Sequence, residues 1–139
     1  MKRYIVATLA AASSIVHADA APATLVCSLS GGTFTSMEID GTVNSKPNSS
    51  GTDLTFAAID LEQHTAQIIG NAGAGPVYVY ASETGMNVLE ITPSGNMNLL
   101  TVMLDDKGGK HPAAYSRHVF TPLIGGMVSQ MFGTCLEKN

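Results

Sequence analysis

Two short polar segments near the C-terminal end contain the residue types that most resemble catalytic groups. They are Tyr115-Ser116-Arg117-His118 and Ser129-Gln130. A serine beside a histidine base is the pattern of nucleophilic hydrolysis, in which the histidine accepts the hydroxyl proton. Residues two apart in a strand have Cα atoms about 6.5–7 Å apart. We therefore do not expect a direct hydrogen bond between Ser116 and His118.

Cross-strand pairing is another way to bring these groups together. One register of a hairpin between the two segments pairs His118 with Ser129 and places Ser116 on the same face. The same register pairs Arg117 with Gln130, and side chains paired in this way are close enough to bond. The chain has no G-x-S-x-G motif and no evident third catalytic member. The favoured interpretation is a bonded polar cluster that fixes the final hairpin, and hydrolysis is the weaker alternative.

No cofactor and no metal site is expected from the remaining polar residues. The histidines His64, His111 and His118 have no close ligand spacing. Asp105-Asp106 lacks the alternating carboxylates and the closing glutamate of a calcium loop. The glycine-rich segment 70–75 precedes a proline and an expected strand, whereas phosphate binding of this kind needs a following helix.

The elements that position these residues are expected to be strands throughout. Alternating apolar residues, with turn signals about every 8–12 residues, indicate eight or nine short strands. No segment keeps a helical period over three turns. We therefore predict an all-β fold, a small antiparallel barrel or sandwich of about eight strands. Residues 21–139 are expected to form a single β domain, because the chain is too short for two.

Several local predictions refine this outline. Gly31-Gly32 is expected to interrupt the first strand, and 43–52 to form a polar loop. Met97–Leu104 is apolar on both faces, which predicts a strand buried on both sides. Methionines within strands are expected at core positions rather than in a copper site. These methionines are Met97, Met103, Met127 and Met131.

Residues 1–20 have the pattern of a cleaved export signal. Two basic residues precede an apolar run that ends at Val16, and His17-Ala18-Asp19-Ala20 fits the A-x-A cleavage pattern. The run is shorter than the roughly 20 residues that a membrane helix needs. No later apolar segment reaches that length. We expect cleavage after Ala20, a mature chain without a membrane span, and a periplasmic or secreted location.

The composition narrows the classes of partner. Charged residues make up 13% of the chain, against roughly 25% in ordinary soluble domains. Removal of residues 1–20 leaves 5 basic and 10 acidic residues and a net charge of −5. This balance excludes a nucleic-acid binder, because nothing would neutralise a run of phosphates. It favours a basic partner instead.

Cys27 and Cys135 are the two cysteines of the chain. In an exported protein they are expected to form one disulfide. They lie near the two ends of the mature chain, so the bond would tie the first strand to the last. Closure of a barrel, which removes exposed strand edges, places the same two strands side by side.

Short segments from about Thr52 onward carry a resemblance to a known group of proteins. They are Ile59-Asp60-Leu61, Thr65-Ala66, Glu90-Ile91-Thr92-Pro93-Ser94-Gly95-Asn96, Tyr115-Ser116-Arg117-His118, Ser129-Gln130 and Phe132-Gly133-Thr134-Cys135. In these segments the chain resembles a group of small exported proteobacterial proteins of uncharacterised function. The resemblance implies a small secreted β protein and carries over no activity.

Two glycine turns carry a looser resemblance. Ser94-Gly95-Asn96-Met97-Asn98 and Lys107-Gly108 are the nearest matches to the Ser-Gly-x-x-Tyr loop and the Lys-Gly motif of periplasmic C-type lysozyme inhibitors. Those inhibitors are small barrels whose disulfide also ties the first strand to the last. The first match lacks the tyrosine, so the resemblance is one of architecture, and function does not follow from fold. Ser94, Gly95 and Asn96 form a candidate binding loop.

The leading functional prediction is an exported binding or accessory protein that is not an enzyme, with inhibition of a basic protein as its specific form. A small-ligand-binding barrel is the alternative, because an eight-stranded barrel can hold one small ligand. A hydrolase with a serine–histidine pair is the weaker alternative. The candidate cluster, functional or structural, consists of Ser116, Arg117, His118, Ser129 and Gln130.

Overall fold

A computed structural model of the chain describes residues 24–70, 73–104, 108–123 and 125–138. Within these residues the structure consists of strands and turns, with no helix. The expected export signal at residues 1–20 lies outside the described residues, and so does the Asp105-Asp106 turn.

Nine strands make up the described fold, which confirms the number predicted from apolar alternation. They are β1 (Thr24–Met37), β2 (Val43–Pro47), β3 (Gly51–Asp60), β4 (Thr65–Gly70), β5 (Gly73–Ala81), β6 (Gly85–Ile91), β7 (Met97–Met103), β8 (Lys110–Thr121) and β9 (Gly125–Lys138). Every pair of neighbouring strands is antiparallel.

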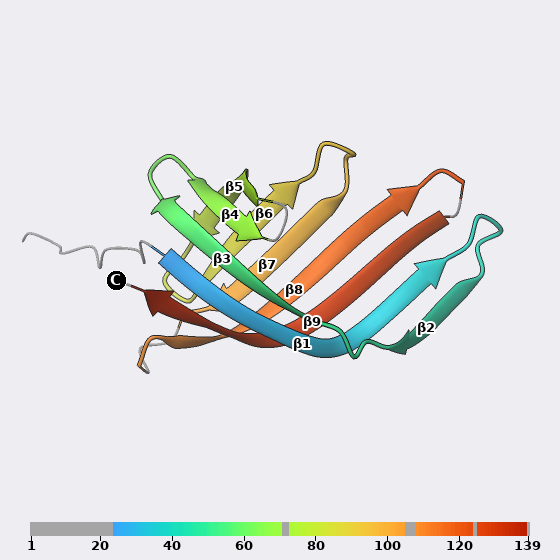
Figure 1. Ribbon diagram of the computed structural model, residues 1–139, viewed down its shortest axis with the longest axis horizontal. Helices are drawn as coiled ribbons and strands as arrows, with labels where there is room; N and C mark the ends of the chain where they lie inside the picture. Colours follow the sequence, from blue (N-terminus) through green and yellow to red (C-terminus); the bar gives the residue numbers. More distant parts are fainter. Residues whose placement is uncertain (1–23, 71–72, 105–107, 124, 139) are drawn as a thin grey trace, which may run out of the picture.

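Eight of the strands close into a barrel (Figure 1). Their order is β1-β3-β4-β5-β6-β7-β8-β9, and β9 pairs again with β1. The ninth strand, β2, pairs with the second half of β1, from Thr33 to Met37. The fold is therefore a closed antiparallel barrel with one extra strand, and the sandwich alternative is excluded.

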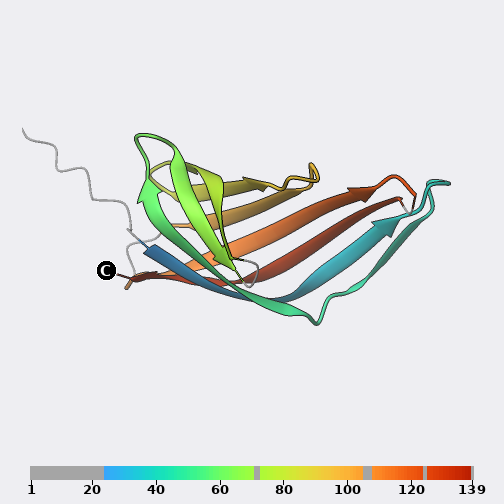
Figure 2. The ribbon, with the colours of Figure 1, turned by 45° about the horizontal axis from the view of Figure 1, so that its top comes forward.

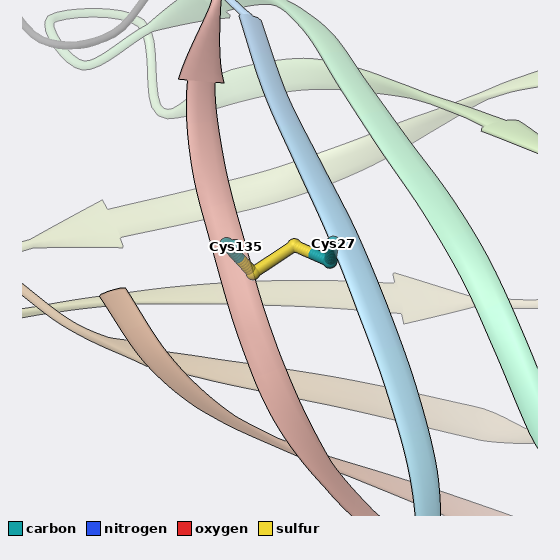
Figure 3. The surroundings of a disulfide bond; sticks show 2 residues. All are labelled: Cys27 and Cys135. Carbon is teal, nitrogen blue, oxygen red and sulfur yellow. A yellow bond between two sulfur atoms is a disulfide. The ribbon is translucent and has the colours of Figure 1, made fainter. Parts of the chain in front are cut away.

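The disulfide between Cys27 and Cys135 confirms the prediction from the cysteine count. Cys27 of β1 lies directly opposite Cys135 of β9, and their Cα atoms are 3.9 Å apart. Figure 3 shows the two side chains bridging the neighbouring strands. Both are fully buried. The bond thus joins the first and last strands at the seam where the barrel closes.

The core consists of apolar side chains that alternate along the strands and point into the barrel. Leu25, Cys27 and Leu29 of β1 are buried, as predicted, and Phe56 of β3 is among the largest buried side chains. Because successive residues of a strand point to opposite faces, the intervening positions reach the outer surface. The other core residues are Leu54, Ala66, Ile68, Val77, Val79, Met86, Val88, Leu100, Val102, Ala113, Tyr115, Met131 and Cys135.

Three of the barrel strands continue beyond the closed barrel and, together with β2, form a curved extension that we call the wing. It comprises the second half of β1, β2, the end of β8 and the start of β9, at residues 33–47, 116–123 and 125–130. Figures 1 and 2 show the wing running away from β4 and β5, with two hairpin turns at its far end. Since β3 pairs with β1 only as far as Ser30, solvent reaches both faces of the wing.

Gly31-Gly32 forms a β-bulge within β1, so the predicted interruption of this strand was wrong. Ser30 pairs with Phe132 of β9 and Thr33 pairs with Gln130, which places two residues of β1 opposite one of β9. Both glycines have positive φ angles, 71° and 101°. Residues with a Cβ atom rarely adopt this conformation, so glycine is required here.

The bulge reverses the alternation of β1 between the barrel and the wing. Leu29 points into the barrel before the bulge. After the bulge, Phe34 lines the same groove as the buried Met131. Even-numbered residues of β1 therefore face the inner side of the wing, and odd-numbered ones face its outer side.

The segment 43–52 is not a polar loop, contrary to the prediction, because it contains β2 and the first residues of β3. All five residues of β2 are exposed. Neither face of this strand is covered by the core, so no apolar alternation marks it in the sequence.

β7 is buried on one face, and the prediction that both faces are buried was wrong. Its inward side chains are buried, whereas Met97 and Met103 are exposed on the outer surface. Met127 of the wing is exposed as well. Of the four methionines predicted in the core, Met131 alone is buried, because alternation gives the spacing of a face and not the face that is covered.

Candidate functional site

The hairpin of β8 and β9 does not have the register predicted from the sequence. Arg117 pairs with Ser129, and His118 pairs with Val128. The predicted pair of His118 with Ser129 does not form. The predicted pair of Arg117 with Gln130 does not form either. The short connection between the paired ends of β8 and β9 sets the register, and a shift of one residue moves a side chain to the opposite face.

The five residues predicted as one polar cluster are therefore divided between the two faces of the wing. Arg117 and Ser129 lie on the inner face, each two positions from a buried side chain of its own strand. Ser116, His118 and Gln130 lie on the outer face, and Ser116 pairs directly with Gln130. Each face has to be considered as a site of its own.

The inner face carries a row of six residues that are paired directly across six neighbouring strands. From β2 to β6 this inner row is Lys46, Phe34, Ser129, Arg117, Asn98 and Glu90. The row crosses the sheet where the barrel opens into the wing, because the next inward side chains of β8 and β9 are the buried Tyr115 and Met131. Sequence reasoning identified two of its members, Arg117 and Ser129.

The charged side chains of the inner row have different surroundings. Asn98 Nδ2 donates a 2.6 Å hydrogen bond to Glu90 Oε2. Lys46 Nζ lies 5.2 Å from the ring centroid of Phe34, a cation–π contact. The exposed guanidinium of Arg117 lies between these two pairs and has no hydrogen-bond or ion-pair partner within the described part of the chain.

Tyr115 lies directly beneath the inner row. Burial of its phenol raises its pKa above the usual 10.0, the positive charge of Arg117 lowers it, and the negative charge of Glu90 raises it. The folded state therefore holds the phenol proton more tightly than the unfolded chain does. The stability that follows is fully present below the unfolded pKa of about 10, and is lost as the pH rises through the higher folded pKa.

We expect Tyr115→Phe to lose less stability in alkali than the wild-type protein. The reason is that phenylalanine has no proton to release, so this contribution to the pH dependence disappears. Urea unfolding between pH 8 and pH 11 measures the effect, and each protein is compared with its own value at pH 8 so that changes in packing cancel. Equal slopes for the two proteins would contradict the assignment.

A groove of about 300 Å³ opens beside the inner row. Its apolar lining comes from the wing and from the barrel rim: Phe34, Val119, Met127 and Met131. Its polar lining includes Arg117 and Ser129 of the inner row, with Asn48 and Ser50 from the connection between β2 and β3 and Thr52 from the start of β3. The groove thus combines an apolar floor, a cation and hydroxyl groups.

Ser116 and His118 form a hydrogen bond on the outer face, contrary to the prediction. Ser116 Oγ lies 3.0 Å from His118 Nε2. Both side chains point to the same side of β8, and the imidazole reaches along the strand to the hydroxyl. Among the described residues, no group binds the other ring nitrogen of His118. A hydrolase triad needs such a group to orient the base, and the described part of the chain does not supply it.

Exposed apolar side chains form a patch on the outer face of the wing and on the adjoining end of β7. This outer patch consists of Met37, Val43, Met97 and Phe120, which come from four different strands. Met37 pairs with Val43, and both Met37 and Phe120 pair with Gly126. The four side chains also line an outer groove of about 490 Å³. Sequence reasoning missed this patch because it placed Met97 in the core.

The two hairpin turns at the far end of the wing continue the apolar surface. We call these turns, residues 38–42 and 122–123, the wing tip. Ile39 is 70% exposed and Leu123 is 87% exposed. The turns lie beside each other because the end of β1 pairs with the start of β9.

The wing tip also carries acidic groups. Glu38 and Asp40 flank Ile39 in the turn between β1 and β2. Asp40 Oδ1 accepts a 2.9 Å hydrogen bond from the backbone N–H of Thr42. This bond, together with one to the side chain of Thr42, lowers the pKa of Asp40. The wing tip is therefore both apolar and negatively charged at neutral pH.

The candidate loop Ser94-Gly95-Asn96 lies beside the wing rather than projecting from it. Asn96 Oδ1 accepts a 3.0 Å hydrogen bond from the backbone N–H of Phe120 in β8. Thr92 closes the turn, with its N–H donating to the carbonyl oxygen of Asn96 over 2.9 Å. The loop thus supports the edge of the outer patch, where Gly95 and Asn96 help to line the outer groove.

The described residues contain no group of three or more histidine, cysteine or acidic side chains that could hold a metal ion. No helix in the described ranges is long and apolar enough to cross a membrane. Comparison with known proteins finds no matching family model, curated protein or solved structure. The two faces and the tip of the wing are therefore the surfaces that point to a function.

Proposed function

We propose that the protein is an exported binding protein that acts without catalysis and docks on a basic protein through the wing tip and the outer patch. The observation that carries the proposal is the exposure of large apolar side chains where the fold projects farthest, above all Leu123 and Ile39. Contiguous exposed apolar surface on a soluble domain is typical of interaction sites.

Charge supports a basic partner. Glu38 and Asp40 are the charged side chains of the wing tip, and the outer patch adds none. The cations of the wing, Lys46 and Arg117, belong to the inner row on the opposite face. A mature chain with a net charge of −5 would steer a basic protein toward this surface and speed their association.

The shape of the wing tip supports inhibition of the basic partner as the specific activity. Two neighbouring turns at the end of a paired sheet can enter a concave site, and a preorganised element loses little conformational entropy when it binds. The disulfide of Cys27 and Cys135 supports an exported location, since such bonds persist in oxidising compartments. Inhibition would then follow from occupying the cleft of a basic enzyme.

Replacing Ile39 and Leu123 by serine is expected to abolish binding to the basic partner. The mature wild-type protein and the double variant are immobilised in parallel and exposed to periplasmic and secreted protein fractions at low and high salt. Mass spectrometry quantifies what each retains. We expect a basic protein to be retained by the wild type, reduced about tenfold or more on the variant because central apolar contacts dominate binding, and released by salt.

A matched control changes apolar residues of the barrel instead. Ile69 and Tyr78 are also large exposed hydrophobic side chains, but they lie outside the wing. The double variant with Ile69→Ser and Tyr78→Ser should therefore retain the partner. Thermal unfolding of both double variants checks that each is folded. The proposed function is wrong if the wild type retains no protein in preference to the tip variant, or if the preferred protein is acidic.

A further inference from the structure

We infer that the groove on the inner face of the wing is a second binding site, for a small molecule with one carboxylate and an apolar body. This inference does not depend on the proposed protein partner. It comes from the opposite face of the sheet, and the two grooves share Val119 and Met127 but otherwise differ in the residues that line them. The groove differs from the interior of the barrel, where the apolar core residues gather.

The anionic group of the ligand is recognised by Arg117. Its guanidinium has no ion-pair partner in the described chain, although Glu90 is only two strands away. That carboxylate is bonded to Asn98 instead. An unpaired guanidinium presents a planar fork of donors that matches a carboxylate. Ser129, directly opposite on β9, adds a hydroxyl that can donate to the same group.

The apolar body of the ligand is recognised by the floor of the groove. Phe34, Val119 and Met127 line it together with the buried Met131. Methionine side chains adapt to apolar ligands of different shapes. A volume of about 300 Å³ lies at the small end of the range for ligand pockets, which favours a short chain or a single ring.

Lys46 lies next to the groove, over the ring of Phe34, and adds a second positive charge beside it that disfavours cationic ligands. Its ammonium group is held over the ring of Phe34, three strands from Arg117. Strands are about 4.8 Å apart, so the two backbone positions are about 14 Å apart. A ligand that binds Arg117 through its carboxylate and lies over Phe34 therefore extends toward the ammonium group of Lys46.

Octanoate is a suitable probe because it combines a carboxylate with a short apolar chain. Two ligands of matched length, octanol and octyltrimethylammonium, test the apolar body alone and the opposite charge. Amide chemical shifts of the mature protein are followed by NMR during each titration. We expect octanoate to shift the signals of Phe34, Arg117 and Ser129 and of their neighbours, and the other two ligands to bind at least tenfold more weakly.

Arg117→Gln is expected to weaken octanoate binding at least tenfold while the barrel signals stay in place. Lys110→Gln removes an exposed cation at the other end of β8 and should bind octanoate as the wild type does. The inference is overturned if millimolar octanoate shifts no signal of the groove, if octanol binds equally well, or if Arg117→Gln binds with wild-type affinity. Loss of the protein partner by a tip variant affects none of these readouts.

Discussion

Replacement of Cys27 and Cys135 by alanine is expected to lower the free energy of unfolding by about 4–5 kcal/mol. The disulfide spans 108 positions of the sequence, so it removes a large part of the conformational freedom of the unfolded chain. Small domains are stable by only about 5–15 kcal/mol in total. The double variant should therefore unfold at a much lower urea concentration and a much lower temperature.

Reduction of the wild-type protein provides the control for this experiment. Dithiothreitol cuts the same bond and leaves both sulfur atoms in their buried positions, so its effect isolates the cross-link from the loss of side-chain packing. Both routes should give losses within about 2 kcal/mol of each other, because the double variant removes two small buried sulfur atoms. A stability that is unchanged by reduction would contradict the role of the bond.

The change of Gly32 to alanine is expected to cost about 3 kcal/mol or more. A Cβ atom at this position would overlap the carbonyl oxygen of Gln130 in β9. The φ angle of 101° adds the cost of a left-handed conformation, about 1–2 kcal/mol for a residue with a Cβ atom. Relief of the overlap requires the bulge to open, and overpacking of this kind costs about 1–3 kcal/mol. Urea unfolding gives the value.

Gly70 is the matched control for this substitution. It also lies in a strand, has no atom within 4 Å of the position of a Cβ atom, and its φ angle is outside the left-handed region. Gly70→Ala should be neutral or slightly stabilising, because alanine restricts the unfolded chain. If Gly32→Ala costs no more than Gly70→Ala, the bulge does not require glycine.

Most of the strands, the all-β class and the disulfide were accessible from the sequence because they depend on local signals, whereas a barrel and a sandwich were left as alternatives. Apolar residues recur at every second position of β1, as in Leu25 and Leu29, and one face of the barrel is buried all round. The two cysteines left a single pairing to consider. These features need no knowledge of which strands are neighbours.

The division of the polar cluster was not accessible, because it depends on a register. A difference of one residue in the hairpin decides whether Ser129 lies opposite His118 or opposite Arg117, and no residue type marks that difference. The bulge at Gly31-Gly32 has the same effect in β1, since it moves Phe34 to the inner face. The inner row therefore became visible only with the pairing of six strands.

The outer patch and the wing tip were missed for another reason. Apolar residues in strands predict a covered face, and Met97 and Phe120 belong to strands that are buried elsewhere in the barrel. In the wing, and at the end of β7 beside it, these strands have no second layer against them, so part of their apolar surface stays exposed. Whether a strand extends beyond its neighbours depends on the lengths of β3 to β7, and these lengths are set by turns far away in the sequence.

In the proposed function, the wing tip is the part of the protein that contacts a basic partner. Photo-cross-linking from a single position tests it most directly. A photoreactive amino acid is placed at Leu123 of the wing tip or, as the control, at Tyr78 on the outside of the barrel, and both proteins are exported and irradiated in cells.

Cross-linked species are then identified by mass and by their peptides. We predict that position 123 forms a discrete adduct with one basic protein, and that position 78 does not form it. An adduct of equal yield from both positions, or none from position 123 while position 78 forms one, would contradict the claim.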